Sequence, residues 1–377
     1  MPRLPSHSAQ PQTSAAVCTA LQAGSLAVFP TETVYALAAN ASADDAVGRL
    51  RHARSSLAGR DLGDLASTWH APSTASVFSA LPGLPALHRR LIRKLAPGPI
   101  TFWIEAGGAE LLAASTSLGV RAGVFTNESL AAVRVPSDVM AGEILTRTIV
   151  PVVAEAIPQA AGGPPAVDAR AAREALSAAG VEVRAFAGTE ATTLRRPSAV
   201  VRLTRSSGPT PISGWALVEP GPYDEAFVRR AAERTMLFVC TGNTCRSPMA
   251  EAIARSVGRA IGAGVESQSA GVGALAGAGV SPEAVKAVRG LGLDPPAGRA
   301  RPLSAGIIAS ADEIYVMTRA HQRAVLSLDP SAASKTRLLD PAGRDVPDPI
   351  GSPQERYDEV ARALRTMIER RLQEDPA

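Results

Sequence analysis

In the second half of the chain, short apolar runs alternate with segments whose apolar residues have helical spacing. Met236–Val239, Ile314–Met317 and Thr336–Leu339 have the length and composition of buried strands. Residues 248–261 and about 353–373 are predicted helices, and the first opens with Pro248, where the missing N–H costs nothing. The last helix has one buried face, formed by Tyr357, Val360, Leu364, Met367, Ile368 and Leu372. This alternation predicts a parallel sheet covered on both faces, with its site beyond the carboxyl ends of the strands.

The first half has a mixed α/β pattern that continues to about Leu203. Residues 205–213 are rich in Pro, Gly and Ser and read as a loop, followed by a predicted strand at Trp215–Val218 and a helix at about Tyr223–Glu233. Four segments of this half each combine a predicted strand with a polar turn. They are Leu26–Leu37, Ala96–Phe102, Val133–Pro136 and Arg195–Val201. We therefore expect a disordered leader at 1–16, a first domain at 17–203, its end and a linker at 204–234, and a second domain at 235–377.

Composition excludes several classes of protein. The 377 residues are 46% hydrophobic and carry a net charge of only +4, unlike a dedicated nucleic-acid coat. Three cysteines and five histidines form no CxxC or HExxH pattern, and none of the few lysines follows a GxxxxG run, so no zinc ribbon, zincin or Walker A loop is expected. With no signal-like leader and no apolar run of about 18 residues, we expect no membrane span and a cytoplasmic location.

The most informative segment leaves one predicted strand and opens a helix. It reads Cys240-Thr-Gly-Asn-Thr-Cys-Arg-Ser247. Backbone N–H groups of such a loop can point inward and bind an oxyanion, with Gly242 supplying unusual backbone angles. Arg246 can donate two hydrogen bonds to phosphate oxygens. The same positive field favours a reactive thiolate at Cys240, at the mouth of the loop, and Ser247 can donate a hydrogen bond to it.

A thiolate that attacks phosphorus needs an acid for the leaving group and then a base for water. One carboxyl group can serve both steps in turn. Asp348, in a constrained Asp-Pro-Ile-Gly loop before the last helix, is the candidate. Asp345 and Asp340 are the alternatives.

The loop resembles that of the low-molecular-weight protein tyrosine phosphatases over about residues 235–373. The segments Ser269–Gly271, Val316–Thr318 with His321, and Asp348-Pro349 match that family's other motifs in order. The resemblance implies a flavodoxin-like (phosphotyrosine phosphatase I-like) domain with a four-stranded parallel sheet, acting on phosphorylated proteins without metal or cofactor. It implies Cys240 as nucleophile, Arg246 as phosphate clamp and Asp348 as general acid. The residues implied to bind phosphate and support the loop are Thr241, Gly242, Asn243, Thr244, Cys245, Ser247 and Ser269.

The residues at positions 244 and 245 indicate which substrate and which reaction are favoured. Position 244 is threonine, as in the branch that resembles protein-arginine phosphatases, and a hydroxyl suits a guanidinium better than an apolar ring. We therefore favour phosphoarginine over phosphotyrosine. Cys245 resembles the family's second loop cysteine, which can form a protective disulfide with the nucleophile. No cysteine follows Cys245, which argues against a thioredoxin-coupled arsenate reductase.

Over about residues 14–230 the chain resembles the YrdC-like threonylcarbamoyl-AMP synthases. Members of that family use ATP, threonine and bicarbonate to make an intermediate for tRNA modification, and some bind double-stranded RNA. The resemblance implies an α/β domain with Thr31 at the threonine end of a cleft. It implies that phosphates or carboxylates lie near the side chains of Arg54, Arg134, Arg196 and Ser198.

This chain departs from that family's pattern at several positions. The Lys-x-Arg-Pro stretch reads His52-Ala-Arg-Ser55, and the Ser-x-Asn contact to the nucleotide falls near Glu155–Pro158, where neither residue type occurs. Alanine stands at positions 36 and 96, where the family has glycine and tryptophan. We therefore predict a degenerate domain that kept the fold and binds RNA or nucleotide weakly, or docks a phosphatase substrate. The alternatives are a working ATP-dependent synthase and an RNA- or nucleotide-binding module, with the phosphatase as accessory in either case.

Overall fold

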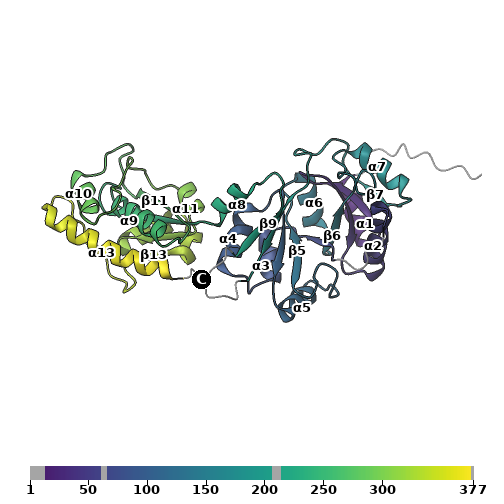
Figure 1. Cartoon of the computed structure of the whole chain (residues 1–377), viewed down its shortest axis with the longest axis horizontal. Coiled ribbons are helices and arrows are strands. Elements are labelled where there is room, and N and C mark those ends of the chain that lie inside the picture. The colour runs from purple at the N-terminus through teal and green to yellow at the C-terminus, as the bar shows by residue number, and fades with distance from the viewer. Residues whose placement is uncertain (1–12, 61–65, 206–213, 375–377) are drawn as a thin grey trace, which may run out of the picture. The chain divides into compact units, whose positions relative to one another are not determined.

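The computed structural model describes residues 13–60, 66–205 and 214–374. The chain divides into two compact units, Met1–Ala231 and Ala232–Ala377 (Figure 1). Most of the predicted leader and of the 205–213 loop lies outside the described residues. Helix α1 (Ser14–Gln22) takes in the last three residues of the predicted leader, because its apolar face packs into the first unit.

The first unit is built on a nine-stranded mixed sheet of order β7-β1-β2-β6-β3-β5-β4-β8-β9. Strands β1 (Ala27–Pro30) and β2 (Tyr35–Asn40) form an antiparallel hairpin, where the sequence predicted one strand and a polar turn. The other strands are β3 (Thr68–His70), β4 (Ile100–Glu105), β5 (Leu130–Arg134), β6 (Val152–Ala156), β7 (Ala185–Phe186), β8 (Ala199–Leu203) and β9 (Trp215–Glu219).

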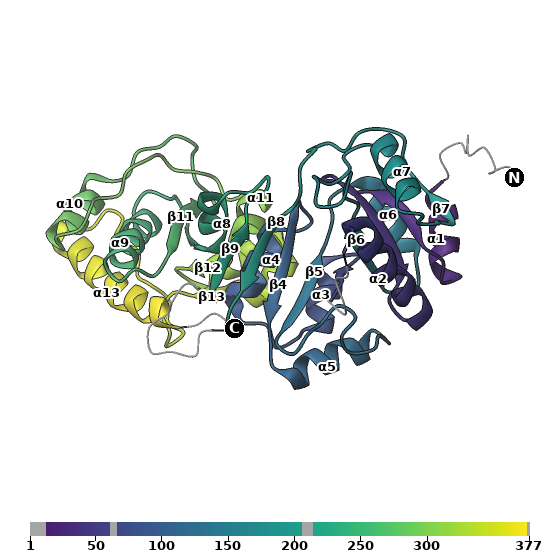
Figure 2. The same cartoon turned by 45° about the vertical axis from the view of Figure 1, so that its right-hand side comes forward.

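Helices cover this sheet, and Figure 2 shows the neighbouring strands β4 and β5 side by side within it. Helix α1 and helix α6 (Val139–Arg147) pack on β1, β2 and β6 through one apolar cluster that includes Leu21, Phe29 and Ile144. The remaining helices of this unit are α2 (Asp44–Ala58), α3 (Thr74–Ala80), α4 (Ala86–Leu95), α5 (Gly108–Ser117), α7 (Ala169–Ala178) and α8 (Glu225–Ala232).

The second unit contains a four-stranded sheet of order β11-β10-β12-β13 in which every neighbouring pair is parallel. Its strands are β10 (Arg234–Cys240), β11 (Val265–Gly271), β12 (Glu313–Val316) and β13 (Thr336–Leu338). The predicted four-stranded parallel sheet is confirmed. The apolar runs at 236–239, 314–317 and 336–339 correspond to β10, β12 and β13. Strand β11 has no apolar run, because it is an edge strand whose first half carries polar residues.

Alternate residues of β10 face two separate apolar clusters. Met236, Phe238 and Cys240 pack against helices α9 (Arg246–Ala260), α10 (Pro282–Gly290) and α13 (Gln354–Gln373). Leu237 and Val239 pack on the opposite face against α11 (Ala305–Ser310), α12 (Arg319–Leu328) and the short 3₁₀ helix η1 (Pro330–Lys335). Helices on both faces leave the carboxyl ends of the strands as the open edge, where the loop after Cys240 begins.

The start of β10 is anchored inside the second unit. Arg234 forms a buried ion pair with Glu313 at 2.7 Å and donates to the carbonyl oxygens of Arg371 and Leu372 at the end of α13. A boundary between residues 234 and 235, as the sequence suggested, would therefore cut within β10. The contacts of the backbone divide the chain three residues earlier, after Ala231.

Candidate functional site

The loop of residues 241–245 joins the central strand β10 to helix α9. Cys240 is the last residue of the strand, and Arg246 is the first residue of the helix. Gly242 was expected to supply unusual backbone angles, and the residue of this loop that has a positive φ is its neighbour Asn243, at +53°. An asparagine whose side chain is held by hydrogen bonds can adopt this left-handed conformation.

The sulfur of Cys240 lies beside the hydroxyl of Ser247, at 3.0 Å from its Oγ. Cys240 is 2% exposed, so its sulfur lies deeper than the expected position at the mouth of the loop. The cause is strand alternation, which directs the side chain toward the apolar cluster beneath α9 and α13. Neighbouring residues therefore cover almost all of Cys240.

Asn243 connects the loop to two other segments. Its Nδ2 donates to Ser247 Oγ at 2.9 Å and to Ser269 Oγ, on β11, at 2.8 Å. Its Oδ1 accepts from the backbone N–H of Arg301 at 2.8 Å. The buried side chain of Asn243 thus donates two hydrogen bonds and accepts a third, which together tie the loop to its surroundings.

The guanidinium of Arg246 meets one of the three candidate aspartates. Its Nη2 lies 2.5 Å from Asp348 Oδ2, and its Nη1 donates to the carbonyl oxygen of Val346 at 3.0 Å. Arg246 is buried, whereas the side chain of Asp348 is 42% exposed. The two alternatives are engaged elsewhere, since Asp345 accepts from the N–H of Arg319 and Asp340 accepts from Ala342 and Arg344.

The remaining loop residues contact their surroundings at several points. Thr241 Oγ1 lies 2.9 Å from Nε2 of His321, whose pKa is lowered by burial and by the Arg246 charge. The backbone oxygen of Thr244 accepts from the N–H of Ser281. Cys245 Sγ lies 3.5 Å from the hydroxyl of Tyr357, and burial together with this contact raises the pKa of that phenol to about 12.

Sequence reasoning gave no structural role to Gly271, the last residue of β11. A Cβ atom there would lie 2.5 Å from the carbonyl oxygen of Thr241 and 2.9 Å from the backbone nitrogen of Asn243. Only glycine lets β11 approach the loop this closely. Its place in the Ser269–Gly271 motif was the only available signal.

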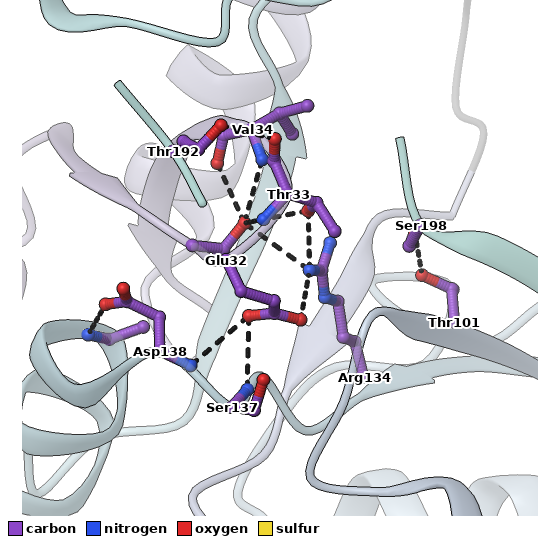
Figure 3. Close-up of polar contacts among 11 residues, drawn as sticks. Glu32, Thr33, Val34, Thr101, Arg134, Ser137, Asp138, Thr192 and Ser198 are labelled. Carbon is purple, nitrogen blue, oxygen red and sulfur yellow. Dashed lines mark hydrogen bonds and ion pairs between the residues drawn. The ribbon is translucent and has the colours of Figure 1, made fainter. Parts of the chain in front are cut away.

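In the first unit, the turn between β1 and β2 packs around Arg134. The guanidinium donates to Glu32 Oε1 at 2.9 Å and to Thr33 Oγ1 at 2.7 Å (Figure 3). It also donates to Thr31 Oγ1 at 3.4 Å. Burial lowers the pKa of Arg134, although the Glu32 carboxylate opposes this shift. The structure thus brings together two predicted cleft residues, Thr31 and Arg134, with Glu32 as the unpredicted partner.

The other predicted cleft residues are placed differently. Ser198 Oγ lies 3.0 Å from Oγ1 of Thr101, which is the strand partner of Arg134. Arg54 forms an ion pair of 3.1 Å with Glu155, at the segment where the family's nucleotide contact is missing. Burial raises the pKa of Glu155. Arg196 is exposed, and its neighbour Arg195 has a φ of +49°.

The described residues contain neither a cluster of metal ligands nor a helix that could span a membrane. No group of three or more His, Cys, Asp or Glu side chains in those ranges is arranged to hold a metal ion. None of the helices in the described part of the chain has the length and apolar character needed to cross a bilayer.

Comparison with known proteins assigns each unit to a family. The family model described as low molecular weight phosphotyrosine protein phosphatase matches residues 235–374. The Sua5/YciO/YrdC family model, which is described as telomere recombination, matches residues 19–212, and this match alone covers about half of the chain. The chain therefore belongs to the low molecular weight phosphotyrosine protein phosphatase family through its second unit and to the Sua5/YciO/YrdC family through its first.

Individual relatives match the second unit. A protein-arginine-phosphatase of Geobacillus stearothermophilus is 36% identical over 139 residues, which are 36% of this chain and 91% of the relative. A low molecular weight protein-tyrosine-phosphatase of Streptomyces coelicolor is 41% identical over 136 residues, 32% of this chain and 81% of the relative. The solved structure of the YwlE arginine phosphatase from Geobacillus stearothermophilus shares 35% identity, with a TM-score of 0.35 over 37% of this chain and 91% of that one.

Proposed function

We propose that the second unit removes phosphoryl groups from proteins through a phosphocysteine formed on Cys240, and that it favours phosphoarginine over phosphotyrosine. The observation that carries the proposal is the grouping of Cys240, Arg246 and Asp348 at the carboxyl end of β10. Relatives named as protein-arginine-phosphatase and protein-tyrosine-phosphatase support the reaction class.

In the first step, the thiolate of Cys240 attacks phosphorus and forms the S–P bond. The P–N or P–O bond to the substrate breaks, and the carboxyl group of Asp348 gives its proton to the leaving nitrogen or oxygen. Arg246 and the N–H groups of the loop stabilise the equatorial oxygens. An incoming phosphoryl group would compete with Asp348 for the guanidinium of Arg246, which frees the aspartate to act on the leaving group.

In the second step, water attacks the phosphocysteine. The ionised Asp348 takes a proton from that water, the S–P bond breaks, and inorganic phosphate leaves with the thiolate restored. Ser247, 3.0 Å from the sulfur, is placed to stabilise the thiolate as leaving group. This sequence of steps requires neither metal nor cofactor.

Cys240→Ser tests the nucleophile. A hydroxyl at this position is far less acidic than a thiol, so phosphate release from phosphoarginine peptides should fall to background. Ser247→Ala should keep residual activity, because it removes a supporting donor and leaves the nucleophile. Release at the native rate from Cys240→Ser would overturn the mechanism.

Thr244 is the basis for the substrate preference. It is half-buried beside Cys245, with its Oγ1 at 3.6 Å from that sulfur. Turnover of phosphoarginine and phosphotyrosine peptides should be compared for the wild type and Thr244→Ile. We expect the wild type to prefer phosphoarginine and the substitution to shift the ratio toward phosphotyrosine. A preference for phosphotyrosine that Thr244→Ile leaves unchanged would contradict the assignment.

We also infer that the first unit is a degenerate member of its family. The positive charge of Arg54 is paired with the carboxylate of Glu155. The chain also lacks the lysine and the Ser-x-Asn pair that the family has at its nucleotide site. Losing such charge-assisted contacts weakens binding by about 1.5–3 kcal/mol each. Calorimetric titration with ATP should show no affinity in the micromolar range. Micromolar affinity, together with an AMP adduct formed from ATP, threonine and bicarbonate, would favour the synthase instead, and a salt-dependent RNA shift would favour an RNA-binding module.

A further inference from the structure

The outer edge of the sheet in the second unit is only partly covered. Strand β11 pairs with β10 on one side, and the main-chain groups of successive residues in a strand point to opposite sides. The carbonyl oxygen of Gly264 and the N–H of Val272 both bond to residues of β10, so the even-numbered residues face inward. The main-chain groups of Ser267 and Ser269 therefore face outward.

The chain itself covers one end of this outer edge. Gly271 donates its N–H to the carbonyl oxygen of Arg301 and accepts from the N–H of Leu303, so residues 301–303 lie parallel to the end of β11. The guanidinium of Arg301 donates to the carbonyl oxygen of Ser269 at 3.0 Å. The edge thus accepts main-chain partners, and at this end it already has them.

The edge is open nearer the start of β11. The N–H of Ser269 and both main-chain groups of Ser267 have no partner within the described residues. Residues 299 and 300 bond instead to residues 277–279, and a cavity of about 310 Å³ is lined by this segment on one side and by β11 on the other. Unpaired main-chain groups along an edge strand are a template for another strand.

The charges that line this cavity favour an acidic ligand. The guanidiniums of Arg299 and Arg301 donate to carbonyl oxygens, and neither pairs with a carboxylate in the described part of the chain. Glu251 is already paired with Arg255, which leaves Glu266 as the other carboxylate of the lining. Two guanidiniums therefore face one uncompensated carboxylate.

We propose that the open part of β11 is a docking site for an extended, acidic segment of the phosphorylated protein substrate, which adds to the sheet as a further strand. Main-chain hydrogen bonds to Ser267 and Ser269 hold the segment, and its carboxylates pair with Arg299 and Arg301. Only the assignment of this segment to a substrate rests on the proposed function. The addition of a strand does not.

The position of the open edge suits a substrate that binds at two points. Gly271, at the end of the same strand, packs against the phosphate loop, and Ser267 lies four residues before it. At about 3.3 Å per residue, the open edge is about 13 Å from the loop. A few extended residues span this distance. One polypeptide can therefore place its phosphorylated side chain in the loop and a neighbouring segment on β11.

Two substitutions at one position separate main-chain binding from side-chain binding. Ser267→Pro removes the outward N–H, and an edge strand tolerates proline where that N–H faces solvent. Ser267→Ala keeps the N–H and removes only the hydroxyl. Arg299→Gln tests the charge, and its matched control is Arg289→Gln, which changes an exposed arginine outside the cavity lining.

The probe is a short peptide in which Asp alternates with Val, capped at both ends and labelled for fluorescence anisotropy. Its binding is measured to the full chain carrying Cys240→Ser, so the assay needs no catalysis. Adding Ser267→Pro should weaken binding about tenfold, and adding Arg299→Gln about threefold. Adding Ser267→Ala or Arg289→Gln should leave the affinity unchanged. A peptide with Lys in place of Asp should bind more weakly.

Equal affinities for the Ser267→Pro and Ser267→Ala proteins would overturn strand addition. No binding of the acidic peptide, or equal binding of its lysine counterpart, would overturn the docking site as a whole. Hydrogen exchange in the unsubstituted chain gives a test that does not depend on the folding of a variant. The amide proton of Ser267 should exchange more slowly when the peptide is bound, and an unchanged rate would contradict the proposal.

Turnover connects the docking site with the proposed function. A phosphoarginine peptide that carries the acidic segment should have a lower KM than the same peptide without it. Ser267→Pro should remove this advantage and leave kcat for the short peptide unchanged. Equal KM values for the two peptides would overturn the assignment of the docked segment to the substrate. Phosphate release that does not depend on Cys240 would overturn the phosphatase mechanism instead, and the binding assay would still decide on β11.

Discussion

At the scale of single residues, the phosphate loop depends on Asn243. Its backbone has a left-handed conformation, and its side chain makes three hydrogen bonds to Ser247, Ser269 and Arg301. Backbone and side chain therefore make separate contributions to the loop. Two substitutions at this one position can tell them apart.

Both Asn243→Ala and Asn243→Gly should slow phosphate release at least tenfold, because both remove the side-chain hydrogen bonds. Asn243→Ala should also lower the free energy of unfolding by about 2 kcal/mol or more, since buried partners lose their donor or acceptor. Asn243→Gly should be about 1 kcal/mol more stable than Asn243→Ala, because glycine adopts a positive φ without strain. Urea denaturation and steady-state kinetics give both quantities. Wild-type turnover in Asn243→Gly would show that backbone shape alone matters.

The three candidate aspartates can be distinguished by a pair of matched variants. Asp348→Asn should reduce kcat about 100-fold or more, with the largest loss for substrates whose leaving groups are most basic, because the general acid is missing. Asp345→Asn should retain kcat within about twofold, since that carboxylate accepts from the N–H at the start of α12. Equal losses in the two variants would argue against Asp348 as the acid.

At the scale of elements, position within the sheet explains both the recognisable strands and the missed one. Strand β10 has neighbours on both sides and helices on both faces, so all seven of its residues are buried. Strand β11 lies at the edge and carries Glu266 and Gln268. In the first unit, β3 is an interior strand, and its last residue, His70, is buried next to Arg134.

Burial and the nearby Arg134 charge lower the pKa of His70 from 6.5 to about 3. In the unfolded chain, His70 takes up a proton below pH 6.5, whereas in the folded protein it does not. The unfolded state therefore binds more protons in this window, and stability falls as the pH is lowered from 6.5 toward 3.

The expected contribution of His70 is a slope of about 1.4 kcal/mol per pH unit below pH 6.5, the linkage effect of one proton. Unfolding of the full chain by urea should show this slope for the wild type when it is followed through the tryptophan fluorescence, which comes from Trp69, Trp103 and Trp215 of the first unit. His70→Gln, which cannot be protonated, should show a shallower one. Parallel pH profiles for the two proteins would mean that His70 is protonated in the folded state.

At the scale of the whole molecule, each unit holds its own set of site residues. Cys240, Arg246, Asp348 and Ser269 all belong to the unit that starts at Ala232. Arg234, near the start of that unit, forms the buried ion pair with Glu313. The phosphatase site should therefore be independent of the first unit, provided that Arg234 is kept.

A fragment of residues 232–377 should release phosphate at a rate within about twofold of the full chain. A fragment of residues 236–377 lacks Arg234 and leaves the Glu313 carboxylate buried without its cation, at a cost of about 3–5 kcal/mol. Urea denaturation of the two fragments measures this difference. Equal midpoints would contradict the anchoring role of Arg234, and an inactive but folded 232–377 fragment would show that the first unit contributes to the reaction.

The sequence by itself determined the local elements of the second unit and the residues of its loop. Hydrophobic periodicity marks β10, β12, α9 and α13 because burial of each element depends on residues close together in the chain. The Cys240–Ser247 segment combines strand, loop and helix within a few residues, so its chemistry can be read without knowing the fold. Thr31 and Arg134 of the first unit were recognised by resemblance, while their contact was not predicted.

The tertiary structure alone decided which groups meet across long separations in the chain. It brought Asp348, rather than Asp345 or Asp340, to Arg246, although Asp348 and Arg246 are 102 positions apart in the sequence. It also placed the left-handed conformation at Asn243 and paired Arg54 with Glu155. The physical reason is that hydrogen bonds and ion pairs depend on ångström-scale distances between side chains, which packing sets and residue spacing does not encode.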